Sequence, residues 1–467
     1  MIYLYGAPAS GKTTLGARLA KALGAKFADL DAVIAERAGM SIPEMFAKGG
    51  EQAFRKAESE ALAFVASSGG GTASVVSLGG GTLLDGRNRR LCEETGTVLC
   101  LDTPPADELA RRIGAAAGSR PLGDKARERA AHYASFPSRV AQWFDLGDSL
   151  VVCGKGFATD LAAGRPAVAD ATFAEAWRGR IGGTVATVPS GEEHKTVATV
   201  ASLWSAFAKA GLGRRDSVVA MGGGVTGDLV GFAAATWMRG IDWINVPTTL
   251  LSMVDASTGG KTGCDLPEGK NLAGAFHPPV LVAIDTDFLS TLPPGVLRQG
   301  RAEMIKHEII GGLPPDAGSR ADAGAPTPGE IARNLAVKVG IVREDPFERT
   351  GRRLLLNCGH TVAHAVEKLS GYAVAHGEAV AIGCVEEARM AVRRGLASSG
   401  WPDELAARFG AAGLPVAMPA GIGSADAVAA MKGDKKRSGD TVVFALPCGW
   451  GDVRAVPVDL AKENPFE

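Results

Sequence analysis

The chain has 467 residues, of which 46% are hydrophobic and 22% charged, and its formal net charge is −1. This length predicts two or three domains. The near-zero charge excludes the basic field that concentrates nucleic acid, and no apolar run approaches the roughly 20 residues that cross a bilayer. Seven scattered cysteines without a CxxC pair, and a start that leaves no room for a signal peptide, predict a protein of the reducing cytoplasm. Strand patterns alternating with helical patterns and glycine turns predict an α/β fold.

The first predicted element is a short apolar strand over residues 2–5, followed by a glycine-rich turn and a helical pattern. The turn reads Gly6-Ala-Pro-Ala-Ser10-Gly11-Lys12-Thr13-Thr14 and matches the P-loop motif in the required strand–loop–helix order. Its glycines let backbone N–H groups face phosphate oxygens, while Lys12 reaches the outer phosphates and Thr13 can hold Mg²⁺. An ordinary glycine loop before a helix is the alternative, and it does not need the Lys-Thr pair.

Further polar and glycine positions follow within the first 145 residues. Asp29 and Asp31 end a predicted strand on one face, because strand side chains alternate. The others are Arg55, Gly79, Gly80, Gly81, Arg120 and Arg129. Each has an ordinary interpretation alone, such as an acidic turn or a surface arginine. Together and in this order they resemble shikimate kinase over the whole segment.

This resemblance implies a P-loop kinase domain over residues 1–145, a parallel sheet with flanking helices that phosphorylates shikimate with ATP and Mg²⁺. It assigns Asp31 to the reacting hydroxyl, and Asp29 with Thr13 to the Mg²⁺ shell. It assigns Arg55 and Arg129 to the shikimate carboxylate beside residues 79–81, which suits the guanidinium fork. The nucleotide residues are then Gly6, Ser10, Gly11, Lys12, Thr13, Thr14 and the lid residue Arg120. A degenerate nucleotide sensor is the alternative, and it would not need the substrate residues.

A new strand pattern begins at Leu150, so we place the junction near residue 146 and expect two abutting, separable halves. An apolar strand from Ser217 runs into Gly222-Gly223-Gly224 and then a helix. This is a pyrophosphate-binding arrangement. It is not GxGxxG in register, so tight strand–helix packing stays open as an alternative.

Histidines and a carboxylate gather in the last third of the sequence. Of the seven histidines, His360, His364 and His376 lie close together, with Glu303 upstream. His360 and His364 are one helical turn apart and face the same way, so their spacing alone favours both as zinc ligands. A satisfied core histidine is the ordinary alternative for any one of them.

Cations lie among small and apolar residues in the same half, first at Arg239, Lys261 and Lys270-Asn271. A solvated helix face would mix charges instead. With the glycine strand and the histidines, these motifs resemble 3-dehydroquinate synthase from about residue 150 to the end. The resemblance implies a Rossmann-like NAD subdomain over residues 146–285 and a mainly helical metal and substrate subdomain over residues 286–467.

The resemblance also implies the site residues. The zinc ligands, with Co²⁺ as a substitute ion, are Glu303, His360 and His376, which leaves His364 for substrate binding and proton transfer. NAD contacts fall on Asp170, Glu192, Lys195, Gly223, Gly224, Asp228, Thr248 and Thr249. Substrate contacts fall on Arg239, Asp255, Lys261, Lys270, Asn271, Lys306, Lys338, Arg353, Asn357, His364 and Lys435, and those with catalytic roles are Asp255, Lys261, Lys306, Arg353 and His364. An arginine at position 239 reaches the neighbouring subunit in the family, so a homodimer is implied.

The implied reaction converts 3-deoxy-D-arabino-heptulosonate 7-phosphate into 3-dehydroquinate and releases phosphate. NAD is regenerated, so the net reaction is a lyase step, and both halves serve aromatic amino acid biosynthesis. Another sugar-phosphate cyclase is an alternative for this half. A metal-dependent polyol dehydrogenase is a second, but it would not need so many cations. The Pro/Gly-rich residues 311–330 predict a loop where the family has helices.

Overall fold

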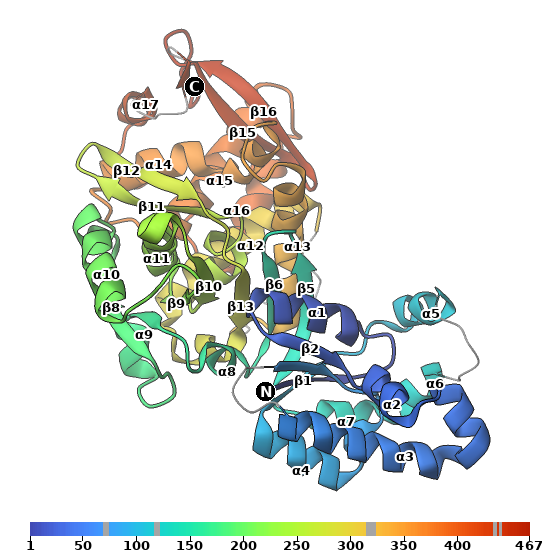
Figure 1. Cartoon of the computed structure of the whole chain (residues 1–467). Helices are drawn as coiled ribbons and strands as arrows, with labels where there is room; N and C mark the ends of the chain where they lie inside the picture. Colours follow the sequence, from blue (N-terminus) through green and yellow to red (C-terminus); the bar gives the residue numbers. More distant parts are fainter. Residues whose placement is uncertain (69–73, 116–121, 314–323, 433–436, 439–440) are drawn as a thin grey trace.

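The computed structural model describes residues 1–68, 74–115, 122–313, 324–432, 437–438 and 441–467. Eleven strands of these residues form one sheet (Figure 1), which confirms the predicted α/β class. In spatial order they are β2 (Lys26–Asp29), β3 (Ser74–Ser77), β1 (Ile2–Gly6), β4 (Thr97–Leu101), β5 (Arg139–Asp145), β6 (Leu150–Lys155), β13 (Leu281–Asp285), β10 (Asp242–Pro247), β9 (Ser217–Gly222), β7 (Ala167–Asp170) and β8 (Thr184–Val188).

The first five strands of this order are mutually parallel and form the sheet of the N-terminal segment. Strand β1 is buried at every position, as expected where helices cover both faces of a parallel sheet. Helix α7 ends before Pro137, and the chain then enters β5 directly. The helices are α1 (Lys12–Ala22), α2 (Leu30–Ala38), α3 (Ile42–Ser68), α4 (Gly86–Thr95), α5 (Ala106–Ala115), α6 (Leu122–Glu128) and α7 (Ala130–Ala134).

The two halves meet in an antiparallel pair, β5 with β6, in which Phe144 lies opposite Val151. One buried cluster takes side chains from both halves, including Leu15 of α1, Val151 of β6 and Leu335 of α13 (Pro328–Glu344). The halves abut, as the sequence predicts. The two halves share a sheet and a hydrophobic core, so cutting the chain between them would divide both.

The other strands, from β6 to β8, are again mutually parallel. Their helices and the attached hairpin are α8 (Ala158–Ala162), α9 (Ala171–Ala176), α10 (Val197–Lys209), α11 (Gly224–Thr236), β11 (Lys261–Leu266) and β12 (Gly269–Phe276). None of the described helices is long and apolar enough to cross a membrane.

The C-terminal region is mainly helical, as predicted (Figure 1). Besides α13 its helices are α12 (Pro294–Gly311), α14 (His360–Leu369), α15 (His376–Arg393), α16 (Trp401–Ala411) and α17 (Ser424–Lys432). A small antiparallel sheet that the sequence did not predict is formed by β14 (Arg437–Ser438), β15 (Thr441–Gly449) and β16 (Asp452–Asp459).

The reversal between β5 and β6 determines where ligands can bind. In open α/β sheets, ligands bind beyond the carboxyl ends of the strands. Strands β1 and β9 lie on opposite sides of the single antiparallel step and run in opposite directions. The carboxyl ends of β1 and β9 therefore point in opposite directions, and the glycine-rich turns that follow these strands lie on opposite sides of the sheet, one at each end of the strands.

Candidate active sites

The P-loop motif follows β1 and runs into α1, whose first residue is Lys12. Gly6 and Gly11 have φ values of 134° and 97°, and a Cβ on Gly6 would lie 2.7 Å from the Leu101 carbonyl oxygen. Both positions therefore require glycine. Ser10 is buried and its hydroxyl has no hydrogen-bond partner among the described residues, whereas Thr14 on α1 is exposed.

The Lys12 side chain folds back over this loop. Its Nζ donates to the carbonyl oxygens of Gly6 (3.0 Å) and Ala7 (2.7 Å). Burial lowers the pKa of Lys12 to about 8, although Asp31 opposes that shift. The predicted Mg²⁺ residues also lie together, because the Thr13 hydroxyl donates to Asp29 Oδ2 at 2.8 Å.

The predicted shikimate residues converge on the glycine turn after β3. A Cβ on Gly81 would lie 2.9 Å from Arg55 Nη2 and 3.0 Å from Arg129 Nη1, and one on Gly79 would lie 3.6 Å from Asp31 Oδ1. One prediction is wrong in detail. The strand ends at Asp29, whose side chain caps α2, so Asp31 lies in the first helical turn and not on a strand face. Arg120 is outside the described residues.

Two residues to which the sequence analysis gave no role hold this turn in place. Glu58 is buried, accepts a hydrogen bond from Thr82 Oγ1 (2.6 Å) and pairs with Arg55 Nη1 (2.7 Å). Tyr133 Oη and Arg129 Nη1 both donate to the Gly80 carbonyl oxygen, at 2.7 and 3.0 Å. The only sequence feature that could have indicated such a role is spacing: Glu58 follows Arg55 by three residues, so the two lie next to each other on a helix.

The second glycine turn packs closely against the segment that follows β10. Strand β9 leads to Gly223, the residue that precedes α11. A Cβ on Gly223 would lie 3.3 Å from Thr249 Cγ2, and one on Gly224 would lie 3.2 Å from Ala256 Cβ. The Thr248 N–H donates to the Gly222 carbonyl oxygen. The backbone of α11 thus begins close against the segment after β10.

The other predicted NAD residues lie at the ends of neighbouring elements. Asp170 ends β7, caps α9 and accepts a hydrogen bond from Ser190 Oγ at 2.7 Å. The buried Lys195 pairs with Asp228 Oδ2 and donates to Asn271 Oδ1, both at 2.6 Å. Asp228 therefore neutralises a lysine that orients the predicted substrate residue Asn271.

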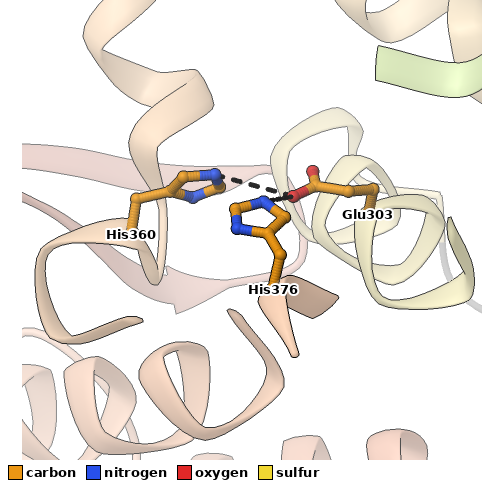
Figure 2. Close-up of side chains that lie close together, drawn as sticks. All are labelled: Glu303, His360 and His376. Atoms are coloured by element: carbon orange, nitrogen blue, oxygen red, sulfur yellow. Dashed lines mark ion pairs between the residues drawn. The ribbon is translucent and has the colours of Figure 1, made fainter. Parts of the chain in front are cut away.

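The predicted zinc ligands come together from three helices (Figure 2). Glu303 of α12 has its Oε1 3.6 Å from His360 Nε2 and 3.4 Å from His376 Nε2. The three ligand atoms lie within 4.8 Å of one another. Glu303 is fully buried and its Oε1 accepts no hydrogen bond within the described part of the chain. One buried carboxylate and two imidazoles fit Zn²⁺ or Co²⁺. His364, a turn further along α14, is not part of the set.

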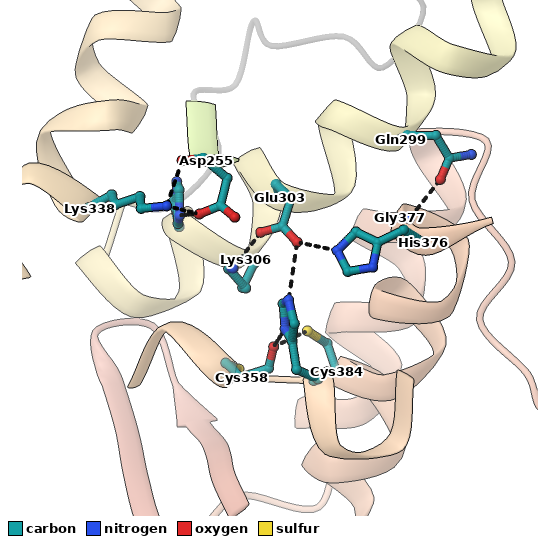
Figure 3. A network of polar contacts seen from close by, with 12 residues as sticks. Asp255, Gln299, Glu303, Lys306, Lys338, Cys358, His376, Gly377 and Cys384 are labelled. Atoms are coloured by element: carbon teal, nitrogen blue, oxygen red, sulfur yellow. Dashed lines mark hydrogen bonds and ion pairs between the residues drawn. The ribbon is translucent and has the colours of Figure 1, made fainter. Parts of the chain in front are cut away.

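Asp255, Glu303 and His307 also lie close enough to hold a metal. Two ammonium groups already neutralise this second set. Lys338 Nζ lies 2.7 Å from Asp255 Oδ1, and Lys306 pairs with Glu303 (Figure 3). Burial opposes the charge of Asp255, yet the lysines hold its pKa well below the usual range. Glu303 and its partner Lys306 belong to both sets, so the ammonium of Lys338 on Asp255 is what makes the second set the poorer cation site.

The remaining predicted substrate residues lie on separate segments of the same half. Lys261 pairs with Glu348 at 2.6 Å, and Arg353 is buried and donates to the carbonyl oxygens of Gly259 and Pro346. Arg239 is exposed on a turn with φ of 69°. Asn357 ends the turn before His360.

Some residues predicted for the C-terminal half lie outside the part of the chain that the structure describes. Lys435 and residues 314–323, the centre of the predicted loop, are not among the described residues. After the predicted loop, Thr327 and Glu330 form a capping box at the start of α13. That helix carries Lys338 to Asp255.

Gln299 and Cys358 hold the two histidine ligands and were not predicted. Gln299 lies one turn before Glu303, and its Oε1 accepts from the Gly377 N–H at 2.7 Å, which fixes the start of α15 at His376 (Figure 3). The Cys358 carbonyl oxygen lies 3.1 Å from His360 Nδ1. This contact leaves Nε2 of His360 for a metal. Such partners are set by packing, which spacing alone does not reveal.

Family models match most of the chain. Shikimate kinase matches residues 8–145. The N-terminal and C-terminal parts of 3-dehydroquinate synthase match residues 185–299 and 300–437.

Curated relatives agree with these matches. A 3-dehydroquinate synthase of a Synechococcus sp. is 46% identical over 279 residues, which is 57% of this chain and 75% of that protein. The enzyme of Xylella fastidiosa is 42% identical over 293 residues, 58% of this chain and 77% of that one.

Two solved structures resemble the C-terminal half. A 2-deoxy-scyllo-inosose synthase in complex with carbaglucose-6-phosphate, NAD⁺ and Co²⁺ has a TM-score of 0.60 at 26% identity, covering 70% of this chain and 99% of that one. A 2-epi-5-epi-valiolone synthase of Streptomyces hygroscopicus with NAD⁺ and Zn²⁺ has a TM-score of 0.58 at 28% identity, covering 68% and 94%. The chain belongs to the 3-dehydroquinate synthase family, carries a shikimate kinase domain at its N-terminal end, and has the two enzyme activities of these families.

Proposed function

We propose that the C-terminal half converts 3-deoxy-D-arabino-heptulosonate 7-phosphate into 3-dehydroquinate and phosphate with zinc and NAD. The observation that carries this proposal is one buried network in which Glu303, His360 and His376 lie beside the cations Lys306 and Lys338 (Figure 3). A dehydrogenase acting on an uncharged polyol has no use for these cations. Identity to named 3-dehydroquinate synthases supports this substrate over those of the other cyclases.

Zinc held by the three ligands supplies a Lewis acid, and NAD held along β9 and α11 supplies a reversible hydride acceptor. Lys306 is fully buried, and the pKa of its ammonium is raised because Glu303 and Asp255 outweigh the effect of burial. It therefore stays charged and can neutralise a substrate anion. Lys261, Lys270 and Arg353 supply further cations for the phosphate and the carboxylate.

His364 is the proposed proton-transfer residue of this half. It is exposed on α14, and its ring centroid lies 5.6 Å from that of His360. An imidazole next to the metal set, but outside it, can exchange a proton with the substrate. Asp255, held by Lys338, orients the ammonium groups around it.

The N-terminal half phosphorylates shikimate with ATP and Mg²⁺. In this proposal the P-loop and Lys12 bind the nucleotide phosphates, and Thr13 with Asp29 holds Mg²⁺. Arg55 and Arg129 fix the carboxylate, so that the shikimate hydroxyl faces Asp31. Most of the acceleration then comes from positioning and charge neutralisation.

Two assays on the same purified chain test both proposals. Phosphate release from the heptulosonate phosphate reports the cyclase, and ADP formation with shikimate reports the kinase. Removal of metal with a chelator should abolish the first activity, and Zn²⁺ or Co²⁺ should restore it. The second should return with Mg²⁺ alone. Net NADH formation, or turnover of polyols, would contradict the cyclase proposal.

A further inference from the structure

Helix α14 carries a third polar residue on the same side as its two histidines. Glu367 follows His360 by seven residues and His364 by three, which places all three along one helix face. Its side chain is 9% exposed. Neither phosphate chemistry nor the predicted ligand set accounts for this buried carboxylate.

The Glu367 carboxylate lies on the outer side of a metal ligand. Its Oε1 is 3.5 Å from His376 Nδ1, while His376 Nε2 faces Glu303 Oε1 at 3.4 Å. A histidine that gives Nε2 to a metal keeps its proton on Nδ1. A carboxylate that accepts this proton fixes the ring and strengthens it as a ligand.

The same carboxylate also faces a predicted substrate cation. Lys270 Nζ lies 3.8 Å from Glu367 Oε1 and 3.7 Å from Glu192 Oε1. Lys270 Nζ also lies over the face of the Tyr372 ring, 4.3 Å from the ring centroid. Three groups from separate segments thus hold Lys270 in place.

We propose that Glu367 is a positioning residue that couples the metal to the substrate in the cyclase. It holds the ring of His376 toward the metal and the ammonium of Lys270 toward the substrate. This inference rests on the proposed zinc-dependent function. Gln299 and Glu378 fix only the backbone at the start of α15 and cannot replace Glu367, because they bond to N–H groups and not to the ring.

Three variants of the full chain test this coupling. Glu367→Ala removes both contacts. Glu367→Gln keeps an oxygen that can accept the Nδ1 proton of His376, but it removes the negative charge that faces the Lys270 ammonium. Lys368→Ala is the matched control, since Lys368 is the exposed neighbour on the same helix. Zinc affinity is measured by competition with a chromogenic chelator, and cyclase KM and kcat on zinc-loaded protein. Kinase activity in the same chain reports that each variant is folded.

Glu367→Ala should lower zinc affinity about 10- to 100-fold, the usual effect of losing such a partner, and should change KM for the heptulosonate phosphate. Glu367→Gln should bind zinc nearly as tightly as the wild type but still change KM. Lys368→Ala should match the wild type in both. Unchanged zinc affinity and KM in Glu367→Ala, with intact kinase activity, would overturn the inference. A wild-type chain that binds no zinc would instead contradict the proposed function.

Discussion

Arg18 of the P-loop helix and Asp145 of β5 form an ion pair at the boundary between the two halves, with 2.5 Å between Nη2 and Oδ1. Arg343 of α13, a helix of the cyclase half, donates to the backbone carbonyl oxygen of Asp145 from Nε and Nη2. Arg165, also in the cyclase half, donates to the Leu23 carbonyl oxygen where α1 ends. The kinase helix α1 is therefore linked to the cyclase half at its C-terminal end by Arg165, and through Asp145 to Arg343 of α13.

The full chain should unfold in one transition, because β5 and β6 pair and one core serves both halves. Binding of ADP and of shikimate, each at about 100 times its Kd, should stabilise the whole chain by about 2.7 kcal/mol per ligand. The temperature at which cyclase activity disappears should rise with the calorimetric midpoint. Two transitions, of which the ligands move only one, would show independent halves. Arg18→Ala should have a small effect, about 0.5–1 kcal/mol, since the pair is partly exposed.

Kinase activity should fall in alkali because of Lys12. A lysine whose pKa is lowered to about 8 by burial loses its charge as pH rises through that value. The value of kcat/KM for ATP should therefore decrease above about pH 8. Bound phosphates oppose deprotonation, so kcat should fall only at higher pH. Lys21→Ala, on the exposed side of the same helix, should leave both profiles unchanged, and a flat kcat/KM profile to pH 10 would contradict the assignment.

Arg55→Ala should weaken shikimate binding steeply and leave nucleotide affinity almost unchanged. The substitution leaves a substrate carboxylate and the buried Glu58 poorly paired, which costs about 2–5 kcal/mol. The measurement is KM for shikimate and for ATP. Lys56→Ala is the control, because its side chain is 80% exposed. An unaltered shikimate KM in Arg55→Ala would mean that the substrate binds elsewhere.

His360 and His364 should respond differently to truncation. His360→Ala removes a ligand of the metal set and should lose zinc. His364→Ala should keep zinc and lose about 10²–10⁴ in cyclase kcat, the range for a proton-transfer residue. Metal content and kcat distinguish them. Equal zinc loss in both would instead make the pair joint ligands.

Arg239 should act across a subunit interface. It is exposed on a left-handed turn next to the exposed Met238, and we propose a homodimer in which it completes the partner's site. Arg239→Ala and His360→Ala should each be inactive as a cyclase. Refolded together, they should recover about one quarter of wild-type activity, because half the dimers then hold one intact site. No recovery despite mixed dimers would place Arg239 in its own subunit's site.

The sequence predicted the parts of the site that local spacing determines. The P-loop follows from a short motif, whereas the set of Glu303, His360 and His376 was predicted only through the resemblance, because spacing alone favoured His360 with His364. It did not predict that Asp31 lies on a helix, because the Asp29 cap that ends the strand depends on backbone geometry.

Long-range packing accounts for what the sequence missed. The pairing of β5 with β6, the cap from Gln299 and the contact of Glu367 with His376 join residues whose distance along the chain carries no periodic signal. The small sheet β14–β16 was overlooked because helical patterns dominate the region before it.

The shared sheet also affects synthesis on the ribosome. Strand β5 and helix α1 are made first, but α13, which completes their core, ends at Glu344. At about 5–20 residues per second, roughly 10–40 s separate the two. During this time an apolar face of the nascent kinase stays uncovered. Chaperone demand and aggregation should therefore be greatest for chains that stop between β5 and α13, even though every kinase motif is already present.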